Sequence, residues 1–401
     1  AGNHQARQIA RWQPQQLGIP SPPTAGPATA GEDYLFSINV EGEPGAYPVY
    51  LNYRIRDDEP YRGALMTQAP AKDGVFEATV PGDFFGEIGF QYFVSTGSGT
   101  DPVYFPASGP DAPGFTGVSL TSESLGVPLA NQYIMMGVPF MPDQDLGTIL
   151  TDALGSYNKS KWRFGRWDPS NGDYDEYPNV DAVAPGRGYW LIQKNPVDIP
   201  ASGVTTSTVG NVVITLEPGW NMVATPYNFP INWSDVIRGA NVQNRLVARS
   251  GGGYTDVTVM NPWQGYWVQN SGLTGTTVTI PPIPANGTAK ASPAKSETAW
   301  EISFGAERGD LYDRGNVAGV SVSGESGVDV QDFHEAPAMP GDVSLYFEIS
   351  DEDRVQKLSR DVRPADTEGQ GWDMVLALPG GGTVQLTMDG IQGVPLDQDV
   401  V

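Results

Sequence analysis

The 401-residue sequence contains no cysteine and only two histidines, His4 and His334. The absence of cysteine excludes a disulfide scaffold, thiol chemistry and any cysteine-ligated zinc or iron–sulfur site. Two histidines so far apart in the sequence give little basis for histidine-based metal binding or base catalysis. No apolar run approaches the roughly 18–20 residues that a transmembrane helix requires. The sequence therefore predicts no membrane span.

Positive charge is also scarce, with 23 Lys and Arg against 47 Asp and Glu and a net charge of −24. Nucleic acid is therefore not an expected partner, and neither is an anionic membrane, because both are bound through clustered Lys and Arg. The acidity has two interpretations. It keeps an exposed protein soluble, or it supplies oxygen ligands for cations.

The common catalytic motifs are missing as well. The sequence has no Gly-x-Ser-x-Gly elbow, no His-Glu-x-x-His, no phosphate-binding Gly-x-x-x-x-Gly-Lys-Ser/Thr loop and no dinucleotide fingerprint. We therefore predict that the protein is not an enzyme and has no catalytic residues. A pair of carboxylates acting as in glycoside hydrolases is the weakest alternative.

Glycine, proline and aromatic residues are abundant, at 49 Gly, 35 Pro and 10% Phe, Trp and Tyr. This composition is typical of many short strands joined by turns, so we expect a mainly β protein. The length exceeds the roughly 250–300 residues that one core serves. We expect an N-terminal arm and Pro-rich linker (1–30), an immunoglobulin- or fibronectin-like sandwich (31–118), two copies of a β-rich repeat with short helices (119–206 and 207–285), a linker (286–297) and a C-terminal β-sandwich (298–401).

Four segments of the expected first sandwich alternate apolar and polar residues: YLFSINV, VYLNYRI, GVFEATV and IGFQYFV. Alternation of this kind predicts half-buried strands, and their spacing is typical of a sandwich. The strings VYLNYRIRDDEPYRGALMT and GVFEATVPGDFFGEIGFQYFVST resemble the small Ig-like modules of bacterial exported proteins. The resemblance covers about a fifth of the chain and implies a fold and an exported location, not an activity.

The middle of the chain contains an internal duplication. The segment QYIMMGVPFMPDQDLGTILTDALG (132–155) matches GWNMVATPYNFPINWSDVIRGAN (219–241), and GYW at 188–190 matches GYW at 265–267. The offsets of 87 and 77 give copy one about ten extra residues, which we place at 166–179. We expect a short helix in each copy, near 145–155 and 232–239. Similar repeats occur in bacterial surface proteins that carry C-terminal (type IX-like) sorting domains, and they are usually non-catalytic.

The last domain is expected to contain strands such as TAWEISFGA, DVSLYFEIS and GWDMVLALP. It resembles the sandwich modules that precede the sorting signal in the same bacterial proteins. Those modules continue through another strand where this chain stops at VPLDQDVV. We therefore expect an unpaired sheet edge that a partner strand can fill.

Calcium is the cation that the acidic loops fit best, because Ca²⁺ takes six to eight oxygen ligands. The first candidate site combines Asp168, Asn171, Asp173, Asp175 and Glu176; the second combines Asp310, Asp313 and Asn316; a third contains Asp351 and Asp353. The alternative for each is an acidic loop that is simply solvated.

Aromatic residues in the same region give a second hypothesis. Trp162, Trp167, Tyr174 and Tyr177 lie close in sequence to Arg163 and Arg166. Exposed aromatic faces beside polar groups would bind a glycan, whereas buried ones would pack between the two copies.

Together these features predict a non-catalytic extracellular or cell-surface structural protein, a filament or matrix component assembled from β-modules. Self-association through the N-terminal arm or the C-terminal edge, or binding to other surface or matrix proteins, would build such an assembly. The alternative is a carbohydrate- or matrix-binding accessory region of a longer exported enzyme.

Overall fold

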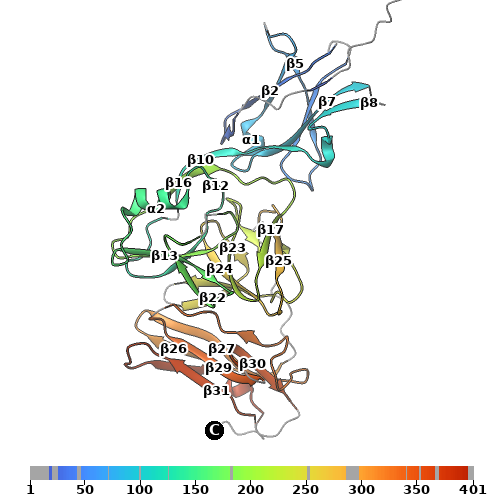
Figure 1. The fold of residues 1–401 in the computed structure, drawn as a ribbon. Helices are drawn as coiled ribbons and strands as arrows, with labels where there is room; N and C mark the ends of the chain where they lie inside the picture. The colour runs from blue at the N-terminus through green and yellow to red at the C-terminus, as the bar shows by residue number, and fades with distance from the viewer. Residues whose placement is uncertain are drawn as a thin grey trace, which may run out of the picture. The chain divides into compact units, whose positions relative to one another are not determined.

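The computed structural model describes residues 18–19, 26–42, 47–70, 72–98, 101–124, 126–180, 184–250, 253–285, 298–339, 341–351, 354–365 and 370–395. The protein is mainly β, as the sequence predicts, with only two short α-helices among these residues (Figure 1). Neither is long and apolar enough to cross a membrane. The chain forms two compact units: Ala1–Leu120 with Val204–Gly210, and Thr121–Gly203 with Asn211–Val401.

The first unit is built from two antiparallel sheets that enclose one core. One sheet has the order β2–β6–β5, and the other has the order β4–β3–β7–β8 with β9 also paired to β7. Its elements are β1 (Ala28–Thr29), β2 (Tyr34–Asn39), β3 (Tyr50–Arg54), β4 (Arg62–Leu65), β5 (Thr67–Gln68), β6 (Val75–Val80), α1 (Gly82–Phe85), β7 (Phe90–Ser98), β8 (Asp101–Phe105), the 3-10 turn η2 (Gly109–Asp111) and β9 (Gly114–Thr116). The alternation seen in the sequence places Phe36, Leu51 and Val94 in this core.

A short distant segment completes this first unit. The hydroxyl of Thr205 donates to the Ile88 carbonyl at 3.0 Å, and that of Thr208 donates to the Ile55 carbonyl at 2.6 Å. Gln91 in turn donates to the Thr208 carbonyl at 2.6 Å. These bonds satisfy buried backbone groups, so residues 204–210 belong with the first unit and not with the repeats, which differs from the boundary expected at residue 206.

The second unit begins with the two repeat copies. Copy one comprises β10 (Val118–Ser124), whose first residues lie in the first unit, β11 (Ile134–Met136), β12 (Met141–Pro142), α2 (Leu146–Leu154), β13 (Trp162–Asp168), β14 (Asp173–Glu176), β15 (Tyr189–Gln193) and β16 (Pro200–Val204). Copy two comprises β17 (Val212–Leu216), β18 (Gly219–Ala224), β19 (Ile231–Asn232), the 3-10 turn η3 (Trp233–Asp235), β20 (Ile237–Arg238), β21 (Leu246–Ser250), β22 (Gly253–Val257), β23 (Val259–Met260), β24 (Gly265–Asn270) and β25 (Thr276–Ile280).

The main sheets of the two copies have the same topology. The order is β11–β15–β13–β14 in copy one and β18–β24–β21–β22 in copy two. Strand pairing then fixes the equivalent residues: the offset is 87 at Met136 and Val223, 82 at Gly165 and Val247, 80 at Tyr174 and Tyr254, and 77 at Trp190 and Trp267. The extra residues of copy one are therefore spread over three connections, and our placement of all of them at 166–179 was wrong.

Only one of the two expected helices is an α-helix. Asp145 caps α2 by accepting from the Thr148 N–H at 3.0 Å, and Gly155 ends it. In copy two the corresponding segment makes one 3-10 turn, η3, and then continues as strand β20, which pairs with β25. The chain has no side-chain cap at Asn232 and runs into the β-branched pair Val236-Ile237, which favours the extended conformation.

The two copies meet around an approximate two-fold axis. The Gly137 N–H donates to the Trp263 carbonyl at 3.2 Å, and the Ala224 N–H donates to the Gly186 carbonyl at 2.8 Å. With offsets of 87 and 77, these are the same bond made in both directions. A contact that is repeated with the roles exchanged is the mark of two-fold symmetry.

The glycine of each GYW motif makes this close approach possible. A Cβ on Gly188 would lie 2.8 Å from the Val223 carbonyl oxygen, and a Cβ on Gly265 would lie 2.9 Å from the Met136 backbone nitrogen. Because no side chain fits between the strands, each GYW strand lies against the first strand of the other copy.

The C-terminal part of the second unit is one sheet. Its order is β31–β29–β30–β27–β26–β32, and β28 also pairs with β30. The strands are β26 (Thr298–Arg308), β27 (Leu311–Ser321), β28 (Phe333–His334), β29 (Ser344–Asp351), β30 (Arg354–Pro364), β31 (Asp373–Ala377) and β32 (Gln385–Asp389), followed by the 3-10 turn η4 (Ile391–Gly393). Phe304 of β26 packs against Phe347 of β29, with ring centroids 6.0 Å apart. The sheet thus folds back on itself, giving two sandwich-like layers.

The glycine at the seam between the copies yields a stability prediction. We expect Gly265→Ala to lower the melting temperature, with a cost of about 1–3 kcal/mol because the added methyl group forces the two backbones apart. Differential scanning calorimetry measures the change. Gly327→Ala is the matched control, since a Cβ there meets nothing within 4 Å. Equal melting temperatures for the two variants would show that the close backbone contact at Gly265 does not stabilise the protein.

Candidate functional site

Tryptophan side chains from both copies gather over the two-fold axis. The ring centroid of Trp267 lies 6.2 Å from that of Trp190, 6.1 Å from that of Trp220 and 5.9 Å from that of Trp167. Met135 and Met222 are buried in the same cluster. We call this cluster the aromatic platform. Its edge-to-face ring pairs and buried apolar area stabilise the association of the two copies.

A loop of the C-terminal sheet lies on the platform and is hydrogen-bonded mainly to copy two. This docking loop comprises residues 332–339 and 341–342. Its backbone carbonyls accept from side chains of copy two: Trp220 Nε1 donates to Glu335 at 2.8 Å, Tyr254 Oη to Pro337 at 2.6 Å and Arg245 Nη1 to His334 at 3.3 Å. Ala336 and Met339 are buried against the platform.

A buried ion pair fixes the end of the docking loop. Arg249 donates from Nη1 and Nη2 to the two carboxylate oxygens of Asp342 at 2.6 and 2.7 Å, and the two side chains are only 4% and 8% exposed. Burial alone would lower the pKa of Arg249, but the bonds to Asp342 outweigh it and raise the pKa overall. Arg249 Nε also donates to the Tyr133 carbonyl of copy one at 3.1 Å. This one guanidinium therefore joins both copies and the loop.

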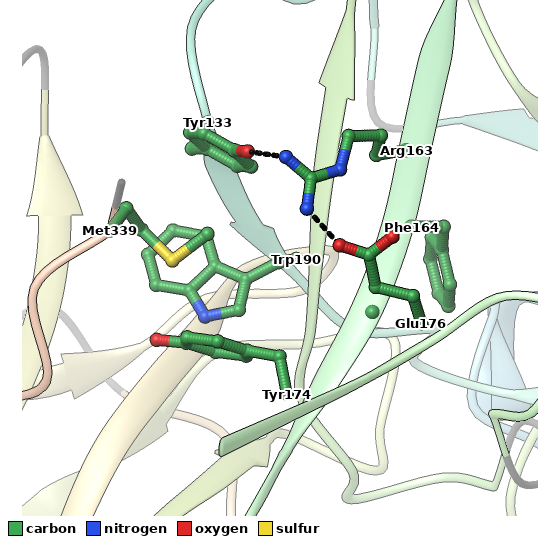
Figure 2. Close-up of a pocket in the computed structure, with 8 residues that line it drawn as sticks. Tyr133, Arg163, Phe164, Tyr174, Glu176, Trp190 and Met339 are labelled. Carbon is green, nitrogen blue, oxygen red and sulfur yellow. Dashed lines mark hydrogen bonds and ion pairs between the residues drawn. The ribbon is translucent and has the colours of Figure 1, made fainter. Parts of the chain in front are cut away.

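A small pocket lies on the half of the platform that belongs to copy one (Figure 2). Its volume of about 30 Å³ has room for one or two water molecules. Arg163 donates to the Tyr133 hydroxyl at 2.9 Å and forms an ion pair with Glu176. Burial raises the pKa of Glu176, but the bonds from Arg163 and Lys159 lower it below its usual value. The lining residues are Tyr133, Arg163, Phe164, Gly165, Tyr174, Glu176, Trp190 and Met339.

Several buried polar atoms of this pocket have no hydrogen-bond partner in the described part of the chain. They include the Tyr174 hydroxyl, Trp190 Nε1 and Arg163 Nε. Figure 2 shows Tyr174 below the Trp190 ring, with Met339 on the other side of that ring. Burial raises the pKa of Tyr174, so its hydroxyl keeps its proton as a donor. Buried donors of this kind call for an acceptor that occupies the pocket.

The first set of expected calcium ligands lies along the β13–β14 hairpin and does not form a cluster. Asp168 accepts from the backbone and hydroxyl of Ser170 at 2.9 and 2.7 Å, and these bonds lower its pKa. Glu176 instead pairs with Arg163. Asp173 and Asp175 are exposed on β14, and Asn171 donates to Asp168 in the turn.

The second expected set is divided between the surface and the core. Asp310 is exposed in the β26–β27 turn, whereas Asp313 and Asn316 are buried. Asp313 accepts from Asn316 at 3.0 Å and from the Leu345 N–H at 2.6 Å. Of the third set, Asp353 is outside the described residues. Within the described ranges, no three His, Asp or Glu side chains gather closely enough to hold a metal ion.

The four aromatic residues considered for glycan binding lie on opposite faces of copy one's sheet. Trp162 is 2% exposed and packs against Tyr177, with centroids 5.4 Å apart. Trp167 and Tyr174 lie on the aromatic platform, 4.9 Å apart. The buried ring of Trp162 is therefore not available to a sugar. Sequence reasoning missed the docking loop altogether, because no local pattern links residues 332–342 to tryptophans over 60 residues away.

Comparison with known proteins adds no family assignment. No protein-family model matches the sequence, and a search of curated proteins finds no match.

The buried ion pair yields a prediction about docking. Asp342→Asn leaves the Arg249 charge uncompensated, and we expect it to cost about 3–5 kcal/mol of stability. Asp256→Asn is the matched control: its partner Arg245 is on the same copy, but the Asp256 side chain is 55% exposed, so we expect less than about 1 kcal/mol. Thermal unfolding gives the size of the loss, and near-ultraviolet circular dichroism reports the platform tryptophans. Similar losses in both variants would show that the pair does not hold the loop.

Two buried carboxyls of the C-terminal sheet make stability depend on pH. Burial raises the pKa of Asp313 to about 6 and that of Asp332 to about 7. Because both groups hold their protons more tightly when folded, their contribution is complete below their unfolded pKa of about 4 and is lost as pH rises towards 7.

We therefore expect the free energy of unfolding to be roughly 4 kcal/mol higher at pH 5 than at pH 7.5. Urea denaturation followed by tryptophan fluorescence measures the difference. Asp332→Asn should reduce the pH slope whatever its effect on baseline stability. An unchanged slope would mean that the dependence comes from the general acidity of the chain.

Proposed function

We propose that this chain is a non-catalytic structural and interaction protein that acts outside the cell and assembles with further copies through the C-terminal sheet. The main observation behind this proposal is that the described strands of the C-terminal sheet leave its apolar core partly uncovered.

Residues opposite each other in an antiparallel pair point to the same face. Leu345 and Phe347 of β29 are buried, so their partners on β31 also point to the core side; Ala306 of β26 and its partner on β32 do the same. Nevertheless these core-facing partners are exposed: Met374 by 41%, Leu376 by 36%, Leu386 by 54% and Met388 by 52%. Among the described residues, no segment covers these side chains.

The uncovered region forms a groove of about 200 Å³. Its lining residues are Phe304, Gly305, Leu345, Met374, Leu386, Thr387 and Met388. The strands on either side, β31 and β32, are the two ends of the sheet, and each pairs with one described neighbour. Free backbone groups beside an apolar groove are what an added strand binds. The groove and the two free strand edges therefore support a structural protein that assembles by adding a strand from another copy.

The topology of the first unit supports an Ig-like module. If β2 to β8 are labelled B, C, C′, D, E, F and G in chain order, the sheets are B-E-D and C′-C-F-G. This is the division of strands found in immunoglobulin-like sandwiches. Modules of this kind are common in cell-surface proteins, which favours an exported location.

The charge of the chain opposes association of copies. Residues 298–401 contain 20 Asp and Glu against six Lys and Arg. Copies that approach through this domain repel each other. At physiological ionic strength, salt screens the repulsion between charges that are more than about 8–10 Å apart. Assembly through the groove is therefore expected to strengthen with salt.

The carbohydrate-binding alternative has less support. Trp162 is buried, and Trp167 and Tyr174 pack within the aromatic platform. Calcium binding by the exposed carboxylates stays a prediction, and assembly gives a way to test it.

Light scattering after size-exclusion chromatography tests the proposed assembly. The mass of the wild-type protein should rise above the 42.9 kDa of one chain as concentration and salt increase. Leu386→Lys combined with Met388→Lys places two charges in the groove and should keep the protein monomeric. Val330→Lys is the control, because Val330 is 96% exposed in a loop. Parallel runs with Ca²⁺ and with EDTA test the acidic loops.

A wild-type protein that stays monomeric at all concentrations and salt levels would contradict assembly. Assembly that persists in the double lysine variant would place the contact elsewhere.

A further inference from the structure

The pocket of copy one and the docking surface of copy two are the same site in two copies of one repeat. Strand register makes Tyr174 equivalent to Tyr254, Trp190 to Trp267 and Glu176 to Asp256. The same offsets make Arg163 equivalent to Arg245 and Tyr133 equivalent to Trp220. Even the ion pair is repeated, as Arg163–Glu176 in copy one and Arg245–Asp256 in copy two.

In copy two this site holds an extended peptide. Tyr254, Trp220 and Arg245 donate to three carbonyls of the docking loop. In copy one the equivalent hydroxyl, that of Tyr174, is buried with no partner in the described structure, and the adjacent pocket has room for a carbonyl oxygen. The donor chemistry is thus present in both copies, but among the described residues a peptide is bound only in copy two.

The pocket continues the established interface. Met339 of the docking loop forms one wall of it and packs on the platform beside Trp190. A peptide bound in the pocket would therefore contact the docking loop and copy one together. Because it adjoins this interface, the pocket is more than an isolated hollow on the surface.

The segment that copy two binds indicates which peptide fits the pocket of copy one. Beside the pocket, Lys159 and Arg163 both pair with Glu176, and Lys161 lies between them in the sequence. The segment bound by copy two carries Asp332, Glu335 and Asp342. A peptide of the same acidic kind as the bound loop suits the equivalent donors of copy one, with Lys161 as the expected partner of a carboxylate.

We propose that the pocket around Tyr174, Arg163 and Trp190 is a second peptide-docking site, which binds an extended acidic segment of a partner protein much as copy two binds residues 334–337. A carbonyl of that segment accepts from the Tyr174 hydroxyl, and its carboxylates lie near Lys161. The site is distinct from the groove between β31 and β32.

The probe is a synthetic acetylated and amidated peptide with the docking-loop sequence QDFHEAPAMPGD, titrated into the full-length protein by isothermal titration calorimetry. We expect one peptide to bind per chain, with an affinity that falls as salt rises. Tyr174→Phe should weaken binding about fivefold, and Lys161→Glu should weaken it and flatten the salt dependence. Tyr104→Phe is the control, because Tyr104 packs against Phe93 in the first unit and does not line the pocket.

Two further measurements separate the alternatives. A peptide with Asn and Gln in place of Asp and Glu should bind more weakly, and a benzophenone in place of its methionine should cross-link to residues of copy one. No binding up to millimolar peptide, unchanged affinity in Tyr174→Phe and Lys161→Glu, or cross-links confined to copy two would each overturn the proposal. Loss of self-association in Tyr174→Phe without peptide binding would also overturn it, by assigning the face to contacts between copies.

Discussion

The second unit depends on the backbone contact between the two repeats, where Gly188 and Gly265 allow each GYW strand to lie against the first strand of the other copy. The same approach brings Trp190 and Trp267 to an edge-to-face distance of 6.2 Å. A larger residue at either glycine would separate the strands and with them the two rings. The aromatic platform, and every contact made on it, follows from the absence of these two side chains.

Duplication gave the platform two equivalent faces, and the chain uses them differently. The position equivalent to Trp167 is Arg249 in copy two, by the pairing of these residues with Tyr174 and Tyr254. The arginine reaches the Asp342 carboxylate, whereas the tryptophan adds a ring to the cluster. One substitution within the pseudo-symmetric pair thus explains why the docking loop is anchored on copy two. A buried ion pair is specific for its geometry, since either charge alone is costly to bury.

Much of this architecture could be predicted from local sequence patterns. Alternation predicted the strands of the first unit, Asp145 and Gly155 marked the ends of α2, and the GYW motifs revealed the duplication. The placement of the extra residues failed because they are divided among three loops, which an offset at two motifs does not resolve. The helix expected near Ser234 failed because tertiary pairing of Ile237 with Thr279 overrides a weak local preference. The candidate site could not be predicted from local sequence patterns, because its walls come from residues 133–190 and from the distant Met339.

The acidic residues divide into two physical classes that composition alone does not distinguish. Asp313, Asp332 and Asp342 are buried and accept hydrogen bonds that fix the C-terminal sheet and its docking loop. The exposed majority produces the repulsion between copies. Buried carboxyls with raised pKa values strengthen the sheet as pH falls, and the same fall in pH reduces the surface charge. Mild acid therefore acts in one direction on folding and on association, so only variants such as Asp332→Asn, which alter one class alone, can separate the two effects.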